Sequence, residues 1–287
     1  MLSSLIYAIM GASEREENKD TCSETLNGGK YNMIFDSHAH YDDEAFDIDR
    51  DELLDSFPFN DIAYVVNVGA DIKTSQNTVE LTKRFPHVYG AVGIHPNEVG
   101  TITSADLMQL RQFAMEDKIV AIGEIGLDYY YREPDKEIQK VWFMKQMELA
   151  RELKLPIIIH SRDAAKDTLD LMKNAYAEEI GGVVHCFSYS KEVAKEILDM
   201  NFYIGIGGVV TFQNAKKLKE AVKEIPLERI VLETDCPYLA PAPNRGKRNS
   251  SLNLPYVAKE IAKLKEISYE EVVETTYKNA KALYRMK

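Results

Sequence analysis

Short apolar runs alternate along this chain with longer segments in which apolar residues recur at helical spacing. The apolar runs occupy residues 33–38, 63–70, 88–95, 120–127, 156–160, 182–187, 202–207 and 229–234. The amphipathic segments between them include residues 72–85, 104–116, 136–154, 164–177, 191–200 and 214–224. Strands that are apolar almost throughout are typical of a parallel sheet covered by helices on both faces. The pattern therefore predicts eight parallel strands separated by helices.

The number and spacing of these strands favour one α/β domain, a (β/α)₈ TIM barrel of about 255 residues. An open, doubly wound sheet is the alternative, but that fold would place a Gly-rich phosphate loop after the first strand. The sequence has no such loop there. Residues 254–286 supply two closing helices, and Ser268 followed by Glu271 predicts the start of the second one.

The first 32 residues are mostly polar and lack periodicity, a composition typical of a disordered tail. One hypothesis is that Met33 is the natural start, because the codons of Gly28-Gly29-Lys30 could resemble a ribosome-binding site. A genuine flexible N-terminal extension is the alternative. In either case we expect a single catalytic domain over residues 33–287.

Composition limits the classes of function. The net charge of −11 argues against a protein that coats nucleic acid through a broad basic face, although it does not exclude a phosphate substrate. No stretch approaches the roughly 20 apolar residues that a membrane span needs, and no signal peptide is indicated. Three cysteines form neither an even disulfide framework nor a C-x-x-C pair. We therefore expect a cytoplasmic protein without a membrane partner, and no obligate protein partner is evident.

Histidines and carboxylates lie within the apolar runs or directly after them. In a (β/α)₈ barrel the C-terminal ends of all strands meet at one face, where active sites are built. Residues far apart in the sequence would therefore come together there. Those that end, lie within or follow a run are His38, His40, His95, Glu124, His160, His185 and Asp235.

Taken singly, a buried His or Glu is more often a hydrogen-bonded structural residue than a metal ligand. Taken together, these residues favour metal binding more strongly than any one of them does alone. His38 and His40 point to the same side of a strand, because side chains alternate with period two, and this spacing suits two adjacent ligands. Glu124 is costly inside an apolar strand unless it is paired or binds a cation.

Four histidines and two carboxylates are too many ligands for one tetrahedral ion, so two divalent ions are the economical interpretation. Glu124 is then the expected bridge between them. Asp235 could bind metal through one oxygen and take the proton of the attacking water with the other. The six expected ligands are His38, His40, Glu124, His160, His185 and Asp235.

Two further segments have both a functional and a structural reading. The basic loop from Arg245 to Asn249 follows the last strand, where barrels commonly bind phosphate, but it could equally be a solvated loop. Tyr129-Tyr130-Tyr131-Arg132 could stack a base and contact phosphate, or form an aromatic rim packed on a neighbouring loop. Cys186 and Cys236 flank ligands and are expected to serve in packing.

From Met33 to its end the chain resembles the TatD-type metal-dependent deoxyribonucleases. Each motif is weak alone, but seven in order at suitable intervals are specific. They are Asp36-Ser37-His38-Ala39-His40, Gly93-Ile94-His95-Pro96, Gly123-Glu124-Ile125-Gly126-Leu127-Asp128-Tyr129, Ile159-His160-Ser161-Arg162, His185-Cys186-Phe187, Glu233-Thr234-Asp235-Cys236-Pro237 and Arg245-Gly246-Lys247-Arg248-Asn249.

The resemblance implies a two-metal hydrolase of phosphodiester bonds that acts on DNA ends or short DNA. It implies Mg²⁺ as the ion, with Mn²⁺ and Zn²⁺ as alternatives, and the same six ligands. It also implies that His95 contacts the scissile phosphate, and Arg245 or Arg248 would hold a flanking phosphate. One departure is that Ser250-Ser251 stands where the family commonly has Glu-Pro.

Two other functions stay open. A related amidohydrolase-like enzyme would hydrolyse an amide, an ester or a small cyclic substrate with the same kind of metal site. Many such enzymes use a Lys as the metal bridge, whereas Glu124 occupies the fourth-strand position here, which favours the nuclease. A binding protein with a structural metal remnant is the third reading, and the complete ligand set argues against it.

Overall fold

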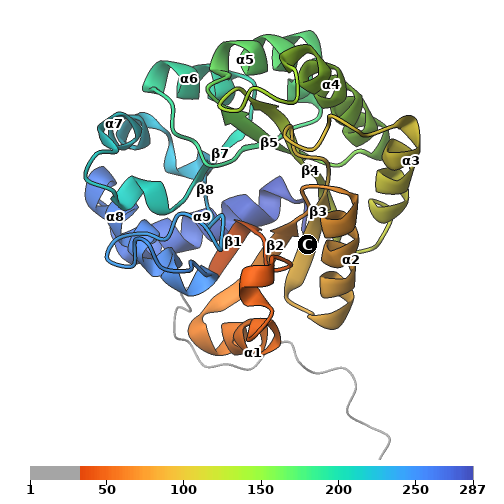
Figure 1. Cartoon of the computed structure of the whole chain (residues 1–287). Helices are drawn as coiled ribbons and strands as arrows, with labels where there is room; N and C mark the ends of the chain where they lie inside the picture. The colour runs from red at the N-terminus through yellow and green to blue at the C-terminus, as the bar shows by residue number, and fades with distance from the viewer. Residues whose placement is uncertain (1–32, 287) are drawn as a thin grey trace, which may run out of the picture. The chain divides into compact units, whose positions relative to one another are not determined.

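The computed structural model describes residues 33–286, so both hypotheses about residues 1–32 lie outside the described residues. Eight strands form one sheet in which each strand pairs in parallel with the next along the chain (Figure 1). They are β1 (Ile34–Ala39), β2 (Ile62–Val68), β3 (Val88–Val92), β4 (Ile119–Asp128), β5 (Ile157–Arg162), β6 (Gly182–Val184), β7 (Tyr203–Ile206) and β8 (Ile230–Leu232).

The sheet closes on itself where the end of β1 meets the segment that follows β8. Ala39 forms a parallel bridge with Cys236, and the backbone N–H of His40 donates to the carbonyl of Cys236 at 2.9 Å. The N–H of Asp235 donates to the carbonyl of His38 at 3.0 Å. We call this junction the barrel seam. The (β/α)₈ barrel predicted from the sequence is therefore confirmed, and the open sheet is excluded.

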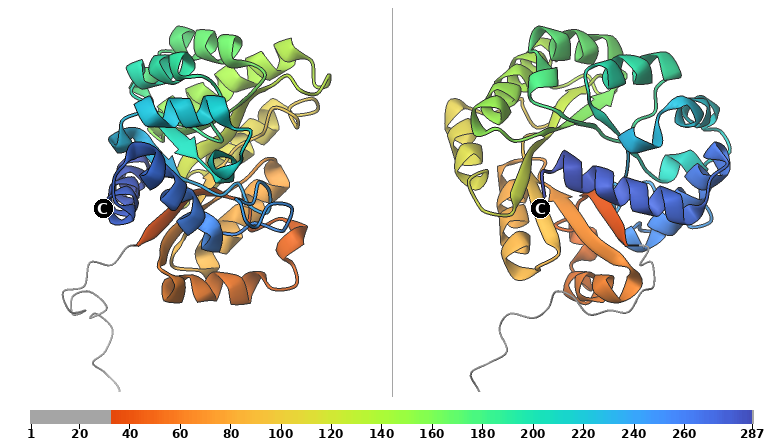
Figure 2. Two further views of the ribbon diagram at one scale, coloured as in Figure 1. Left: turned by 90° about the vertical axis from the view of Figure 1, so that its left-hand side faces the viewer. Right: turned by 180° about the vertical axis from the view of Figure 1, so that it is seen from behind.

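Helices surround the strands on the outside of the barrel (Figures 1 and 2). One of them, Arg50–Ser56, carries only two adjacent leucines and no apolar periodicity, so the sequence pattern does not predict it. The helices are α1 (Arg50–Ser56), α2 (Ile72–Arg84), α3 (Ser104–Phe113), α4 (Lys136–Leu153), α5 (Ala165–Asn174), α6 (Lys191–Asp199), α7 (Lys216–Glu224), α8 (Leu254–Lys265) and α9 (Tyr269–Leu283).

Side-chain caps fix where several helices begin. Asp71 and Thr74 form a reciprocal capping box at the start of α2. The Ser268 hydroxyl accepts a hydrogen bond from the N–H of Glu271 at 3.0 Å, so the predicted start of α9 is confirmed. Among residues 33–286, no helix has both the length and the apolar character needed to cross a membrane.

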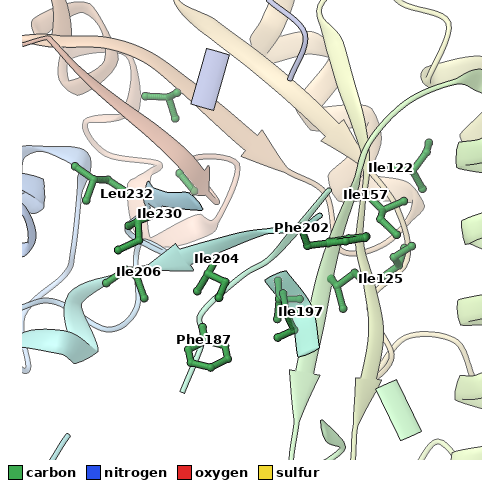
Figure 3. Packing of buried hydrophobic residues seen from close by; sticks show 14 of the residues in the cluster. Ile122, Ile125, Ile157, Phe187, Ile197, Phe202, Ile204, Ile206, Ile230 and Leu232 are labelled. Atoms are coloured by element: carbon green, nitrogen blue, oxygen red, sulfur yellow. The ribbon is translucent and has the colours of Figure 1, made fainter. Parts of the chain in front are cut away.

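Two apolar clusters hold the barrel together. The larger lies between the strands and the surrounding helices, and Figure 3 shows Ile204, Ile206 and Ile230 within it. The smaller contains side chains from every strand but, among the helices, only from α9, so it fills the barrel interior. The buried Tyr284, just after α9, donates its hydroxyl to the carbonyl of Ser37 at 2.7 Å. Helix α9 thus covers the barrel opening seen from behind in Figure 2, opposite the C-terminal ends of the strands.

Candidate metal centre

His38 and His40 lie at the end of β1 on the same side of the strand, as their spacing predicts. Their Nε2 atoms are 3.1 Å apart. Asp235 joins them across the barrel seam, with Oδ1 at 3.4 Å from Nε2 of His40 and 3.7 Å from Nε2 of His38. One ligand atom from each of the three residues lies within 4.8 Å of the other two. We call His38, His40 and Asp235 the seam group.

A second set of ligand atoms comes from β4, β5 and the residue that follows β6. Oε1 of Glu124 is 2.6 Å from Nδ1 of His160 and 2.5 Å from Nε2 of His185. The two imidazole nitrogens are themselves 3.2 Å apart. We call Glu124, His160 and His185 the central group.

Glu124 connects the two groups, because its carboxylate oxygens face different partners. Oε1 faces His160 and His185, whereas Oε2 is 3.5 Å from Nε2 of His38 and 3.9 Å from Nε2 of His40. The side chain is nearly fully buried. Each group offers imidazole nitrogens together with carboxylate oxygens, a donor set that suits Zn²⁺ and Mn²⁺ and that accepts Mg²⁺ through its oxygens. The six residues therefore could hold divalent cations, and the carboxylate of Glu124 faces both groups.

Charges within the site set the protonation of its histidines. Burial alone would lower the pKa of His40, but the hydrogen bond and charge of Asp235 outweigh burial and raise that pKa to about 9. Burial also opposes protonation of His160, yet Glu124 and Asp128 raise its pKa to about 9. His38 behaves differently, because burial and the neighbouring His185 lower its pKa to about 4. These buried carboxylates thus attract positive charge to the positions where cations would bind.

Two of the imidazoles are also held by their second ring nitrogen. Nδ1 of His40 lies 2.8 Å from the carbonyl of Val68, and Nε2 of His160 lies 3.2 Å from Oδ2 of Asp128. Such outer partners fix the orientation and tautomer of a metal-binding histidine. In the sequence Asp128 stands out only as part of a motif. Its position at the C-terminal end of β4 is the signal that could have placed it in the site.

His95 lies beside the central group rather than within it. Strand β3 ends at Val92, so His95 belongs to the following loop. Its Nε2 is 3.8 Å from Oε1 of Glu124, and its ring packs edge-on against His160 with the centroids 4.4 Å apart. Its Nδ1 accepts a hydrogen bond from the N–H of Asn97 at 3.1 Å, which leaves Nε2 directed at the site.

The two arginines of the basic loop engage neighbouring loops. Arg248 forms a bidentate ion pair with Asp49, with N–O distances of 2.7 and 2.5 Å. The guanidinium of Arg245 lies over the ring of Phe212, 4.3 Å from its centroid. Asn249 ties the loop to the site, because its Nδ2 donates to the carbonyl of Thr234 at 3.0 Å.

Two aromatic side chains stand at the same face of the barrel. Tyr130 and Tyr131 are 59% and 50% exposed, and the guanidinium of Arg162 lies 3.8 Å from the centroid of Tyr130. The N–H of Tyr130 donates to Oδ1 of Asp128, which connects this pair to the central group. Tyr129 instead turns its hydroxyl to Asp167 at 2.7 Å.

Glu233 is a buried carboxylate near the candidate ligands, and nothing in the sequence alone marks it as part of the site. It precedes Asp235 of the seam group by two residues, and its Oε1 accepts a hydrogen bond from the N–H of Cys186 at 2.5 Å. Burial raises the pKa of Glu233 to about 8. A carboxylate that stays ionised at this depth needs further hydrogen-bond donors or cations nearby.

The chain is similar in sequence and in fold to known proteins. Residues 35–285 match the model of a family described as "TatD related DNase". The chain is 46% identical over 254 residues to the protein named "Uncharacterized metal-dependent hydrolase YabD" of Bacillus subtilis, covering 88% of this chain and 100% of that protein. It is 36% identical over 257 residues to the similarly named YcfH of Escherichia coli K12, covering 88% and 96%. The crystal structure of YjjV, a TatD homolog from E. coli K12, superposes with a TM-score of 0.84 at 26% identity, covering 90% of this chain and all of that one.

Proposed function

The chain belongs to the family of TatD-related DNases and is a metal-dependent hydrolase, and on that premise we propose that it hydrolyses phosphodiester bonds with two divalent ions. The proposed substrates are DNA ends or short DNA. The observation that carries this proposal is the carboxylate of Glu124, which presents one oxygen to the seam group and the other to the central group. A shared carboxylate between two mixed nitrogen and oxygen sets suits a two-metal hydrolase.

The proposed ligands are His38, His40 and Asp235 for one ion and His160 and His185 for the other, with Glu124 shared. When bound, two such ions supply a hydroxide equivalent at neutral pH and neutralise charge on the leaving oxygen. Mg²⁺ is proposed from the family, and Mn²⁺ and Zn²⁺ are the alternatives that the imidazoles favour.

Asp235 is the proposed general base. Its Oδ1 faces the two histidines of the seam group, which leaves Oδ2 for the proton of the attacking water. Burial opposes ionisation of Asp235, but His40 and the other histidines outweigh burial and keep its pKa below the ordinary value. The side chain is 19% exposed, so water can reach it. It is therefore ready to accept a proton at neutral pH.

His95 is the proposed contact to the scissile phosphate. Burial and the neighbouring His160 lower its pKa to about 3, so the ring is neutral at physiological pH. Since Nδ1 accepts from the N–H of Asn97, the proton of the neutral ring resides on Nε2. That N–H can donate to a phosphate oxygen beside the central group.

Groups outside the metal site would bind the rest of the substrate. Tyr130 and Tyr131 offer exposed rings on which an unpaired base could stack, and Arg162 adds positive charge beside them. Arg245 and Arg248 are the proposed contacts to a flanking phosphate, and Arg248 would have to share its guanidinium between that phosphate and Asp49. Binding would thus depend on a few local groups, as the acidic composition requires.

A direct test compares wild type with the His160→Ala and Asp235→Asn variants on single-stranded and double-stranded oligonucleotides. Each protein is incubated with Mg²⁺, Mn²⁺ or Zn²⁺ in turn. We expect wild type to release nucleotides with at least one ion and both variants to be strongly impaired. If wild type cleaves amide or ester substrates but no oligonucleotide with any ion, the amidohydrolase-like alternative is correct. Equal degradation by all three proteins would indicate a contaminating nuclease and would give the assigned site no support.

A further inference from the structure

Three buried polar atoms near the metal centre have no hydrogen-bond partner among the residues that the structure describes. They are Nδ1 of His38, Nδ1 of His185 and Oε2 of Glu233. A buried polar group without a partner destabilises the folded protein, so three in one place require an explanation.

These atoms belong to residues that come together in space. One nitrogen from each of the two histidines and one carboxylate oxygen of Glu233 lie within 4.8 Å of one another. The rings of His38 and His185 are stacked, 4.1 Å apart at an interplanar angle of 13°. Nε2 of each ring faces Glu124, so Nδ1 is the nitrogen turned away from the proposed metals.

We propose that Glu233 positions His38 and His185 through one buried water molecule that bridges Oε2 and the two Nδ1 atoms. This inference rests on the metal-ligand roles proposed above. Three ligand atoms that lie no more than 4.8 Å apart can share one water, because the centre of a triangle with sides of that length is about 2.8 Å from each corner, an ordinary hydrogen-bond length. Buried waters typically make about three such bonds.

The direction of each hydrogen bond follows from the chemistry of the groups. A metal-binding imidazole uses the lone pair of Nε2 and carries its proton on Nδ1, so both histidines donate to the water. Cations bound at the two groups would favour the ionised carboxylate of Glu233, so the water would accept two N–H groups and donate to Oε2. A third cation at this position would instead require both imidazoles to lose their last proton, which disfavours a metal there.

The carboxylate of Glu233 is itself fixed on two sides. Oε1 accepts the N–H of Cys186, and a Cβ added at Gly205 would lie 2.2 Å from Oε2. The other two histidines already have outer acceptors, His40 in the carbonyl of Val68 and His160 in the carboxylate of Asp128. Glu233 thus completes the outer contacts by serving one histidine of the seam group and one of the central group.

The Glu233→Gln variant tests the direction of these bonds while conserving size. The N–H of Cys186 holds the amide oxygen in place of Oε1, so the amide NH₂ points at the water. The water must then donate to one imidazole, whose proton moves to Nε2, where it blocks metal binding. We expect affinity for Mn²⁺ or Zn²⁺, measured by calorimetry, to fall roughly 10- to 100-fold. The matched control is Glu228→Gln, an exposed position before β8, which should bind metal like wild type.

A second measurement needs no variant. In Zn²⁺-loaded wild type, ¹⁵N spectra of the histidine side chains should show protonated Nδ1 on both His38 and His185, with metal analysis giving two ions per chain. Unchanged metal affinity in Glu233→Gln, a deprotonated Nδ1 in wild type, or a third ion bound at Nδ1 would each overturn the proposal. Failure of wild type to bind any ion would instead overturn the proposed function on which it rests.

Discussion

The hydroxyl of Ser251 lies 2.6 Å from Oδ2 of Asp36, although 215 residues separate the two in the sequence. Both side chains are fully buried. Asp36 also accepts hydrogen bonds from the backbone N–H and the hydroxyl of Thr234, so it holds β1 to the segment after β8. Ser251, part of the departure from the family motif, therefore stabilises the barrel seam and is turned away from any substrate.

Replacing Ser251 with Ala should destabilise the protein. The substitution removes a donor to a buried carboxylate, which costs about 1–3 kcal/mol. For a domain of this size, each kcal/mol lowers the melting temperature by roughly 2–4 °C. Ser250→Ala is the control, because no side-chain hydrogen bond of Ser250 caps the short helix that follows it. Equal melting temperatures of the two variants in calorimetry would contradict this role.

Replacing Glu124 with Gln should impair both metal sites together. The amide keeps the shape of the side chain but removes the negative charge shared by the seam and central groups. We expect the bound metal to fall below two ions per chain and the affinity of the remaining site to drop at least about 10-fold. Metal analysis after dialysis measures this, with Glu116→Gln on the exposed surface as the control. Retention of two tightly bound ions would exclude the bridging role.

Replacing Asp235 with Asn should lower the rate more than it lowers metal occupancy. The amide can still offer an oxygen to a metal but cannot accept the proton of the attacking water. General base catalysis contributes roughly 10²- to 10⁴-fold to a rate, so kcat should fall by about that factor at saturating metal. Full recovery of kcat at high metal concentration would show that Asp235 is only a ligand.

Removing metal should lower the thermal stability of the protein. The proposed ligands come from five strands or the residues that follow them, so a bound ion would favour the folded chain over the unfolded one. At a free ion concentration 100 times the Kd, one site adds about 2.7 kcal/mol, which raises the melting temperature by roughly 5–10 °C. A chelator should reverse this rise and fresh Mn²⁺ should restore it. A melting temperature that neither the chelator nor Mn²⁺ changes would contradict metal binding to the folded protein.

The sequence was sufficient to predict the barrel and to bring the six expected ligands together at one face, because both follow from local pattern. Apolar runs mark strands, and His38 and His40 share a face whatever their partners are. The outer contacts could not be predicted in this way. Glu233 looks in the sequence like any acidic neighbour of Asp235, and only packing against Cys186 and Gly205 shows where its carboxylate points.

The pairing of Arg248 with Asp49 could not be predicted from the sequence either, because 199 residues separate them. The hydrogen bond from Arg248 lowers the pKa of Asp49. An acid whose pKa is lower in the folded state contributes stability above its unfolded pKa and loses it as the pH falls through the folded value.

A double-mutant cycle with Arg248→Ala and Asp49→Ala should therefore give a coupling energy of about 0.3–1 kcal/mol at pH 7, the range of partly exposed ion pairs. The coupling should disappear once the pH falls below the ordinary range of an Asp carboxyl. Denaturant unfolding at both pH values measures it. A coupling that persists at low pH would show that the contact is not ionic.

The seam group also has a consequence for the order of events in the cell. Its residues lie near opposite ends of the domain's sequence. His38 and His40 are therefore synthesised early and Asp235 late, and α9 follows later still. A chain released prematurely by the ribosome would carry the histidines without their carboxylate partner and without the helix that covers the far barrel opening. Hydrolysis that depends on this centre is thus withheld from incomplete translation products.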